Sequence, residues 1–243
     1  MKIYVVGIGP GNREYMTPQA EAAIAESDVV VGYTLYVDLV KELTQGKEVR
    51  STAMKQEVDR CKMALEAALE GKTVAFVCSG DAGVYGMAGV MAEVAEGYPQ
   101  VEIVTVPGIT AACSGAAVLG APLIHDFAVI SLSDLLTPWE KIEKRLALAA
   151  EADFVVCLYN PKSKKRHDYI DKAAEIMSPF KSWDTPCGYV KNIGREGETS
   201  VVCTLADLKN NEDIDMFTTV FVGNSQTKVI NGKLVTPRGY KGV

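Results

Sequence analysis

Short runs of β-branched residues alternate with helical segments along the first half of the chain, and most runs end in a loop rich in glycine or proline. Thr17-Pro18 is a typical helix start, with Thr as the cap and Pro in the first turn. Residues 57–70 have helical periodicity and stop at Gly71. Repeated β-α alternation predicts a mainly parallel sheet with helices on its faces. The predicted strands are 2–6, 28–31, 73–78 and 101–106.

The second half starts with the same alternation and then changes. Thr137-Pro138-Trp139-Glu140 fits a capping box that opens a helix to about residue 150, and a second helix is predicted over 166–177. Strands are predicted first at 128–132 and 154–159, then at 188–191, 200–204, 217–222 and 233–235 without long helices between them. We therefore expect an α/β fold of two α/β domains, 1–117 with a mainly parallel sheet and 118–243 with a mixed sheet.

Charge and composition exclude several classes of protein. The 243 residues carry a net charge of −6, which argues against a general nucleic-acid binder. Two histidines, and six cysteines without a CxxC pair, predict no protein-bound metal and a reduced, cytoplasmic protein. The uncharged stretch 103–124 is broken by glycines and prolines, so we expect no membrane-spanning helix there and no membrane partner.

Five loops follow predicted strands, at 7–12, 79–86, 107–112, 159–161 and 222–227, where α/β sheets bind ligands. The first is not a dinucleotide fingerprint, because Asn12 replaces the third glycine and Pro10 lacks an N–H; this disfavours a nucleotide-dependent dehydrogenase. In the second loop, Asp81 either accepts hydrogen bonds from a ligand or caps the next helix. Both interpretations stay open on the sequence alone.

Polar residues in the second half are further candidates. The run 162–167 places four cations where a helix is predicted to begin, which indicates either a solvated charge run or an anionic ligand nearby. His125 stands beside Asp126, and an imidazole next to a carboxylate is a pair that permits proton transfer. Ser131 and Asp134 follow a predicted strand, but no GxSxG elbow supports a serine hydrolase.

In order, VVGIGPGN, SGDAGVYGMAG and VPGITAA resemble the tetrapyrrole methylase family, and the resemblance extends over essentially the whole chain. GAPLIHDFAVISLSDLLTPW, ADFVVCLYNPKSKKR and TPRGY are similar to one branch, enzymes of cobalamin biosynthesis that methylate carbon 17 of the macrocycle and contract the ring. The resemblance implies S-adenosylmethionine (SAM) as methyl donor in a cleft between two domains, an anionic tetrapyrrole as substrate, and a homodimer.

The resemblance and the loop positions together assign roles to individual residues. The cofactor-binding residues would be Pro10, Gly80, Asp81, Ala82, Val84, Tyr85, Thr110, Ala111, Asn160, Asn192 and Thr236. The candidates for acid–base steps in ring contraction are His125, Asp126, Ser131 and Asp134. The substrate carboxylates would meet Lys164, Lys165, Arg166, Lys191, Arg195 and Arg238.

Alternatives remain within and outside this branch. The substrate is either metal-free precorrin-3B or cobalt-factor III, since the cobalt would belong to the macrocycle. Another tetrapyrrole methylase acting at a different carbon is the nearest alternative. A methylase of a macromolecule, similar to the diphthine synthases, is a further one.

Overall fold

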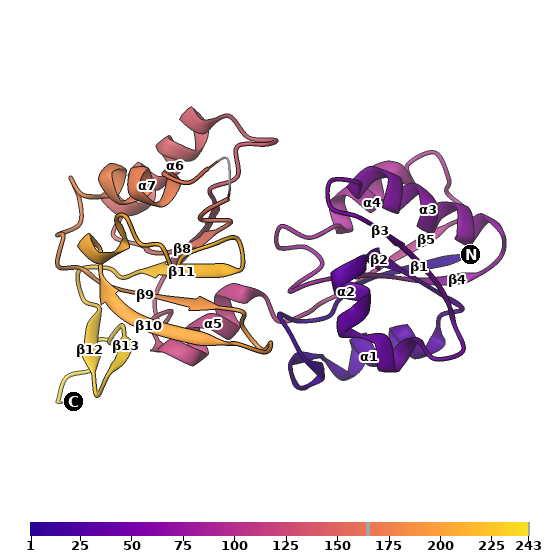
Figure 1. Cartoon of the computed structure of the whole chain (residues 1–243), viewed down its shortest axis with the longest axis horizontal. Helices are drawn as coiled ribbons and strands as arrows, with labels where there is room; N and C mark the ends of the chain where they lie inside the picture. The colour runs from indigo at the N-terminus through magenta and orange to yellow at the C-terminus, as the bar shows by residue number, and fades with distance from the viewer. Residues whose placement is uncertain (164–165, 243) are drawn as a thin grey trace. The chain divides into compact units, whose positions relative to one another are not determined.

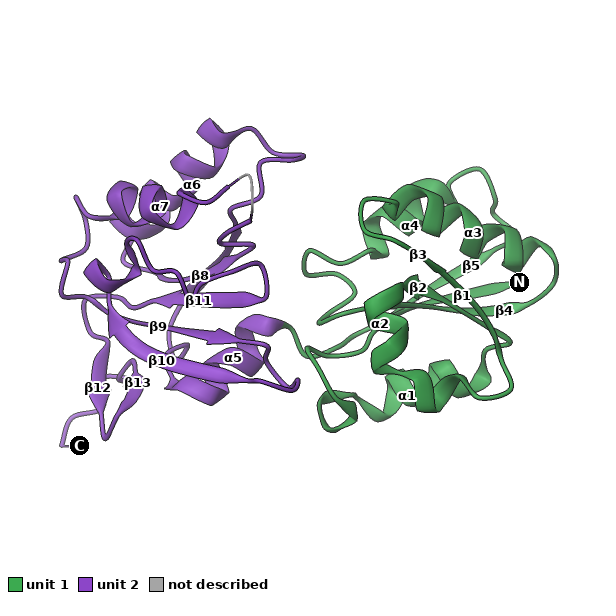
Figure 2. Cartoon of the chain, in the orientation of Figure 1, with its two compact units in different colours: residues 1–110 green, residues 111–243 purple. Residues whose placement is uncertain are grey.

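The computed structural model describes residues 1–163 and 166–242. The chain folds into two compact units, Met1–Thr110 and Ala111–Val243 (Figures 1 and 2). The domain boundary predicted between residues 117 and 118 falls inside helix α5 (Ala111–Leu119). This helix packs against four strands of the second unit, which is why the division lies at its start instead.

The first unit is a five-stranded sheet in the order β3-β2-β4-β1-β5, and every pair is parallel. The strands are β1 (Lys2–Gly7), β2 (Val29–Tyr33), β3 (Glu48–Thr52), β4 (Thr73–Cys78) and β5 (Glu102–Val106). The helices are α1 (Pro18–Glu26), α2 (Thr34–Leu39), α3 (Glu57–Leu69) and α4 (Ala88–Val94). The parallel sheet is confirmed, whereas α2 and β3 were not among the predicted elements.

Alternation along the strands divides the core of this unit between the two faces of its sheet. Val5 packs with α3 and α4 on one face, while the next residue, Val6, packs with α1 and α2 on the other (Figure 1). The predicted cap of α1 is confirmed, because Thr17 Oγ1 accepts a hydrogen bond from Ala20 N at 3.1 Å. Short 3-10 turns occur at Arg13–Tyr15 and Lys41–Thr44.

The second unit has a mixed sheet in the order β10-β9-β11-β8-β7. β7 (Phe127–Ser131) runs parallel to β8 (Val155–Tyr159), and β11 (Thr218–Val222) is antiparallel to β8 and to β9 (Pro186–Lys191). β10 (Thr199–Thr204) closes one edge, antiparallel to β9. Helices α6 (Trp139–Glu151) and α7 (Tyr169–Met177) pack on one face and α5 on the other. The predicted mixed sheet is confirmed.

A smaller sheet of the second unit joins β12 (Lys228–Ile230), β13 (Lys233–Val235) and β6 (Gly120–Ala121). A 3-10 turn lies at Ala206–Leu208. No helix in the described part of either unit is long and apolar enough to cross a membrane.

Two helix starts differ from the sequence prediction. Pro138 is the N-cap of α6 and has no side-chain oxygen to accept a bond, so the predicted capping box from Thr137 does not form. α7 begins at Tyr169 rather than at residue 166, and the backbone of Arg166 exchanges hydrogen bonds of 3.1 and 3.2 Å with that of Ser163 instead. The predicted conflict between the basic run and the helix dipole therefore does not apply to Arg166. Lys164 and Lys165 lie outside the described residues.

Candidate functional site

The loops that follow β1, β4 and β5 lock together at the carboxyl edge of the first sheet. Gly9 and Gly80 exchange backbone hydrogen bonds of 3.1 and 2.7 Å across an isolated antiparallel bridge. Asp81 Oδ1 accepts from Gly83 N at 2.8 Å and from Val84 N at 3.0 Å, and its Oδ2 accepts from Gly108 N at 2.9 Å. One carboxylate thus shapes its own turn and ties it to the neighbouring loop.

Only glycine fits at the centre of this contact. A Cβ atom on Gly108 would lie 2.2 Å from Gly80 O, and one on Gly7 would lie 2.7 Å from Gly108 N. The clashing atoms belong to the backbone, so they have no rotamer by which to move away. Gly7 and Gly108 are therefore required for this packing, whatever the loops bind.

The candidate cofactor residues of the first unit differ in accessibility. Pro10 and Ala82 are buried and support the loops, and Gly80, Asp81 and Thr110 are half-buried. Val84 is 38% exposed and Tyr85 is 57% exposed, with a left-handed backbone (φ 52°) at Tyr85. A bulky residue in this conformation is uncommon and strained.

An exposed turn with accessible backbone suits an adenosyl group. A Cβ on Gly83 would meet only Asp81 Oδ1, at 3.4 Å, so there is space against this part of the main chain. Val84 and Tyr85 offer exposed apolar contact beside this main chain. These residues fit SAM, whereas in the part of the chain that the structure describes no three His, Cys, Asp or Glu side chains gather as a metal site would require.

In the second unit, the ends of β7 and β8 carry a polar contact between two predicted site residues. Ser131 Oγ accepts from Asn160 Nδ2 at 3.0 Å and from Ser133 N at 3.2 Å. Asn160 has a left-handed backbone, with φ at 52°. Because β7 and β8 are parallel neighbours, their carboxyl ends bring these two residues together.

Asp134 lies next in a network with Arg166 and Tyr169. The hydroxyl of Tyr169 donates to Asp134 Oδ2 at 2.7 Å, and Arg166 Nη1 lies 3.7 Å from Asp134 Oδ1 and donates to Ser133 Oγ at 2.5 Å. The Tyr169 hydrogen bond first, and Arg166 in addition, hold the pKa of Asp134 below its usual range. Asp134 is therefore a carboxylate at neutral pH rather than a proton donor.

Sequence reasoning did not identify Tyr169, which stands 35 residues from Asp134 and has no local motif. Arg166 was identified, but for a different role. Its side chain is 14% exposed, and its buried Nε has no hydrogen-bond partner among the described residues. Its guanidinium already contacts Ser133 and Asp134, so within this structure it holds the 131–134 loop.

Strand direction separates the four residues predicted to act as acids and bases. Ser131 ends β7 and Asp134 follows it, whereas His125 and Asp126 precede the strand. At about 3.3 Å per residue, the strand places Asp126 roughly 16 Å from Ser131. The structure therefore does not bring the four together, because they lie at opposite ends of β7.

The other predicted residues of this unit divide in the same way. Lys191 is the last residue of β9 and lies at the same end of the sheet as Ser131. Its Nζ forms an ion pair with Asp215 Oδ2 at 2.7 Å. Asn192 and Arg195 follow in the turn between β9 and β10. At the opposite end, Arg238 Nη1 donates to Ile124 O at 3.0 Å. Thr236 is fully buried, with its hydroxyl 2.9 Å from that of Thr227. Ala111 is the first residue of α5 and is half-buried.

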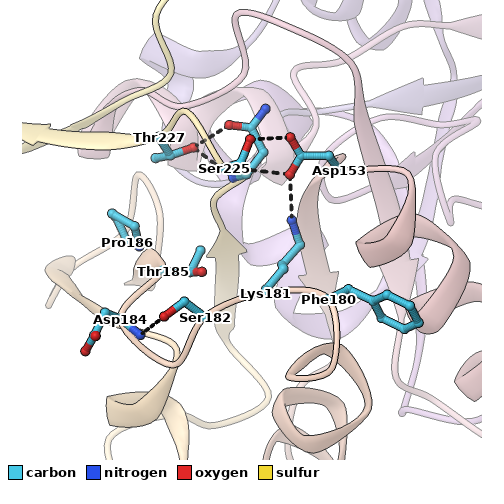
Figure 3. A pocket seen from close by; sticks show the side chains of 10 residues that line it. Asp153, Phe180, Lys181, Ser182, Asp184, Thr185, Pro186, Ser225 and Thr227 are labelled. Carbon is cyan, nitrogen blue, oxygen red and sulfur yellow. Dashed lines mark hydrogen bonds and ion pairs between the residues drawn. The ribbon is translucent and has the colours of Figure 1, made fainter.

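A pocket of about 340 Å³ lies at the edge where β8 and β9 begin (Figure 3). Lys181 is buried there and donates to the carbonyls of Phe154 and Gly223, each at 3.0 Å, with Asp153 Oδ1 at 3.7 Å. Burial lowers the pKa of Lys181. With these acceptors, the lysine ties the start of β8 to the end of β11 and is a structural residue of the pocket.

Comparison with known proteins agrees with this geometry. The sequence profile of the Tetrapyrrole (Corrin/Porphyrin) Methylases matches residues 2–209. A protein of Salmonella typhimurium named probable cobalt-factor III C(17)-methyltransferase is 48% identical, over 97% of this chain and 98% of its own. The precorrin-3B C(17)-methyltransferase of Sinorhizobium sp is 39% identical, over 99% of this chain and 97% of its own.

Among solved structures, that of the methyltransferase CobJ superimposes with a TM-score of 0.90 at 39% identity, over 97% of this chain and 99% of that one. The similarity therefore includes both units of the fold as well as the loops at the strand ends. From the profile match, the relatives and the shared fold, we conclude that the chain belongs to the tetrapyrrole methylase family and is a methyltransferase.

Proposed function

We propose that this chain transfers a methyl group from SAM to carbon 17 of cobalt-factor III or precorrin-3B and contracts the macrocycle, a step of cobalamin biosynthesis. The observation that carries the proposal is identity of 39–48% over nearly the whole chain with two proteins named for this reaction. It is supported by the likeness to CobJ, which extends over 97% of the chain.

The first unit would bind the methyl donor. SAM, when bound, supplies a methyl group on a sulfonium, which passes to a nucleophilic carbon of the tetrapyrrole. Such a transfer depends on in-line positioning more than on a protein nucleophile. The backbone bridge between Gly9 and Gly80 and the tether from Asp81 to Gly108 hold the donor loops in one shape. Val84 and Tyr85 project from this fixed frame.

The second unit would supply polar groups for the ring contraction. Asp134 is held ionised by Tyr169 and Arg166, so it accepts a proton or stabilises a developing positive charge. Ser131 is oriented by Asn160 and would act as a hydrogen-bonding group toward the substrate. We assign Arg166 as a positioning residue, since its guanidinium contacts the 131–134 loop. Binding of a substrate carboxylate by Lys191 would require exchange with Asp215.

Anaerobic incubation with SAM and either cobalt-factor III or metal-free precorrin-3B tests the proposal. We expect a product heavier by one methyl group, with the absorbance change of a contracted ring, for at least one substrate. Isotope-labelled SAM followed by NMR locates the new methyl group. A label at another carbon would identify a different tetrapyrrole methylase, and no methylated product from either substrate would refute the proposal.

We also propose a cytoplasmic homodimer, as the family resemblance implies. Sedimentation of the purified chain tests the dimer, and cell fractionation tests the location. A monomer at all concentrations, or recovery outside the cytoplasm, would refute the corresponding part.

A further inference from the structure

The first turn of α2, which follows β2 directly, and the loop after β3 present exposed apolar side chains at the carboxyl edge of the first sheet. Leu35 is 43% exposed and Met54 is 45% exposed. In the sheet order β3-β2-β4, β2 lies beside β4 and β3 lies one strand further out. Neighbouring strands lie about 4.8 Å apart, so the end of β3 is roughly 10 Å from the start of the Asp81 loop. The cofactor motifs include neither the start of α2 nor the loop after β3.

Lys55 places a cation beside these apolar groups. It is exposed, and it makes no ion pair with any residue the structure describes. Its backbone is left-handed, with φ at 70°. A lysine in this conformation is strained relative to glycine or asparagine, and such outliers cluster where a side chain must be presented in one direction.

The base of the Lys55 loop is fixed from inside the fold. Arg60, at the start of α3, is 5% exposed and donates through Nη1 to Thr52 Oγ1 at 2.7 Å and to Ala53 O at 2.8 Å. Thr34, the first residue of α2, donates through Oγ1 to Thr52 O at 3.2 Å. The guanidinium of Arg60 also lies 5.8 Å from the centre of the Tyr33 ring. These contacts fix the base of the loop at Thr52 and Ala53, directly before Met54 and Lys55.

We propose that Leu35, Met54 and Lys55 form a substrate-contact surface, on which Lys55 binds a carboxylate and the two apolar side chains pack against the tetrapyrrole ring. The inference rests on the proposed function, because that function supplies the occupant. A flat apolar ring with acidic substituents complements an exposed cation flanked by exposed apolar groups. On a chain of net charge −6, an unpaired lysine at this edge adds attraction where an anionic ligand needs it.

Steady-state kinetics and equilibrium titration of three variants test this surface. For Lys55→Gln we expect KM and Kd for the tetrapyrrole to rise about three- to fivefold, the range of one exposed ion pair, with KM for SAM unchanged. The rise should shrink as salt is added. Leu35→Ser/Met54→Ser should weaken tetrapyrrole binding at every salt concentration. Lys228→Gln is the matched control, since Lys228 is exposed on β12 and follows Thr227 at the pocket.

The outcomes separate this inference from the proposed function. Titration by the visible absorbance of the tetrapyrrole measures Kd even if the wild-type protein does not turn over, which would refute the function alone. Wild-type binding with unchanged Kd in both the Lys55 and the Leu35/Met54 variants would refute the surface. A Leu35/Met54 variant that changes oligomeric state in sedimentation without a change in Kd would show a subunit contact instead. No binding to the wild-type protein would refute both.

Discussion

Replacing Asp81 by Asn distinguishes a structural tether from a ligand-binding group. The carboxylate accepts three backbone N–H bonds, two within its own turn and one from Gly108. An amide has one acceptor oxygen. If that oxygen keeps the bonds to Gly83 and Val84, the amide NH2 faces Gly108 N–H, donor against donor. The contact between the loops after β4 and β5 is then lost.

The structure sets the size of the effect. A hydrogen bond to a charged group contributes about 1.5–3 kcal/mol, and a neutral acceptor about half as much. Asp81 is half-buried, so we take the lower end and expect Asp81→Asn to lose about 2 kcal/mol of unfolding free energy. For a chain of this size, the melting temperature would fall by about 4–8 °C.

Thermal unfolding and SAM titration of the same protein are the assays. We expect Asp81→Asn to melt earlier and to bind SAM more weakly, because the displaced turn carries Val84 and Tyr85. Asp38→Asn is the matched control, since Asp38 is exposed at the end of α2. An Asp81→Asn protein that melts with the wild type yet loses SAM affinity would refute the tether and make Asp81 a ligand contact.

Three further predictions follow from the second unit. Tyr169→Phe removes the main cause of the lowered pKa of Asp134, so the acid limb of kcat/KM should move to higher pH; an unmoved limb would mean that ionised Asp134 is not needed. In the native protein a thiol-specific reagent should react rapidly with Cys113 alone, because it is the exposed cysteine of the six. Burial raises the pKa of Cys61 to about 11 and that of Cys203 to about 12, which keeps these thiols protonated. Fast labelling of a second thiol would contradict this. Lys181→Met leaves two carbonyls without their donor and should cost about 3 kcal/mol of unfolding free energy, with KM for the tetrapyrrole unchanged. An unaltered melting temperature would show that the pocket does not need the hydrogen bonds of Lys181.

The sequence predicted those elements whose burial imposes a pattern. β1, β2 and β4 are mostly buried and rich in Val and Ile, so their apolar runs were recognised. β3 is an edge strand with exposed side chains, and Glu48 and Arg50 form ion pairs along it. Such an edge carries charge instead of apolar alternation and leaves no periodic signal. The six-residue α2 is too short to show helical periodicity.

Site residues could be predicted where they stand at the end of a strand. They could not be predicted where the site depends on which distant side chains the fold brings together. The rule that ligands meet the carboxyl ends of strands selected Ser131 and Asn160, and the structure joins them by a hydrogen bond. His125 stands only six residues before Ser131, but those residues form a strand and separate the two across the sheet. Two residues on either side of a strand are close in sequence but far apart in space, and a local sequence motif does not show this separation.

The geometry of the first unit implies that its main chain matters to methyl transfer as much as any ionisable side chain. The contacts between the loops after β1, β4 and β5 are backbone atoms spaced so closely that a Cβ on Gly7 or Gly108 has no room. In-line transfer loses rate steeply when the reacting atoms are displaced by about 1 Å. A single methyl group at Gly108 displaces the Asp81 turn by a comparable amount, because its Cβ would lie 2.2 Å from Gly80 O. Replacing Gly108 by Ala should therefore impair turnover as severely as replacing Asp134 by a residue without a carboxylate.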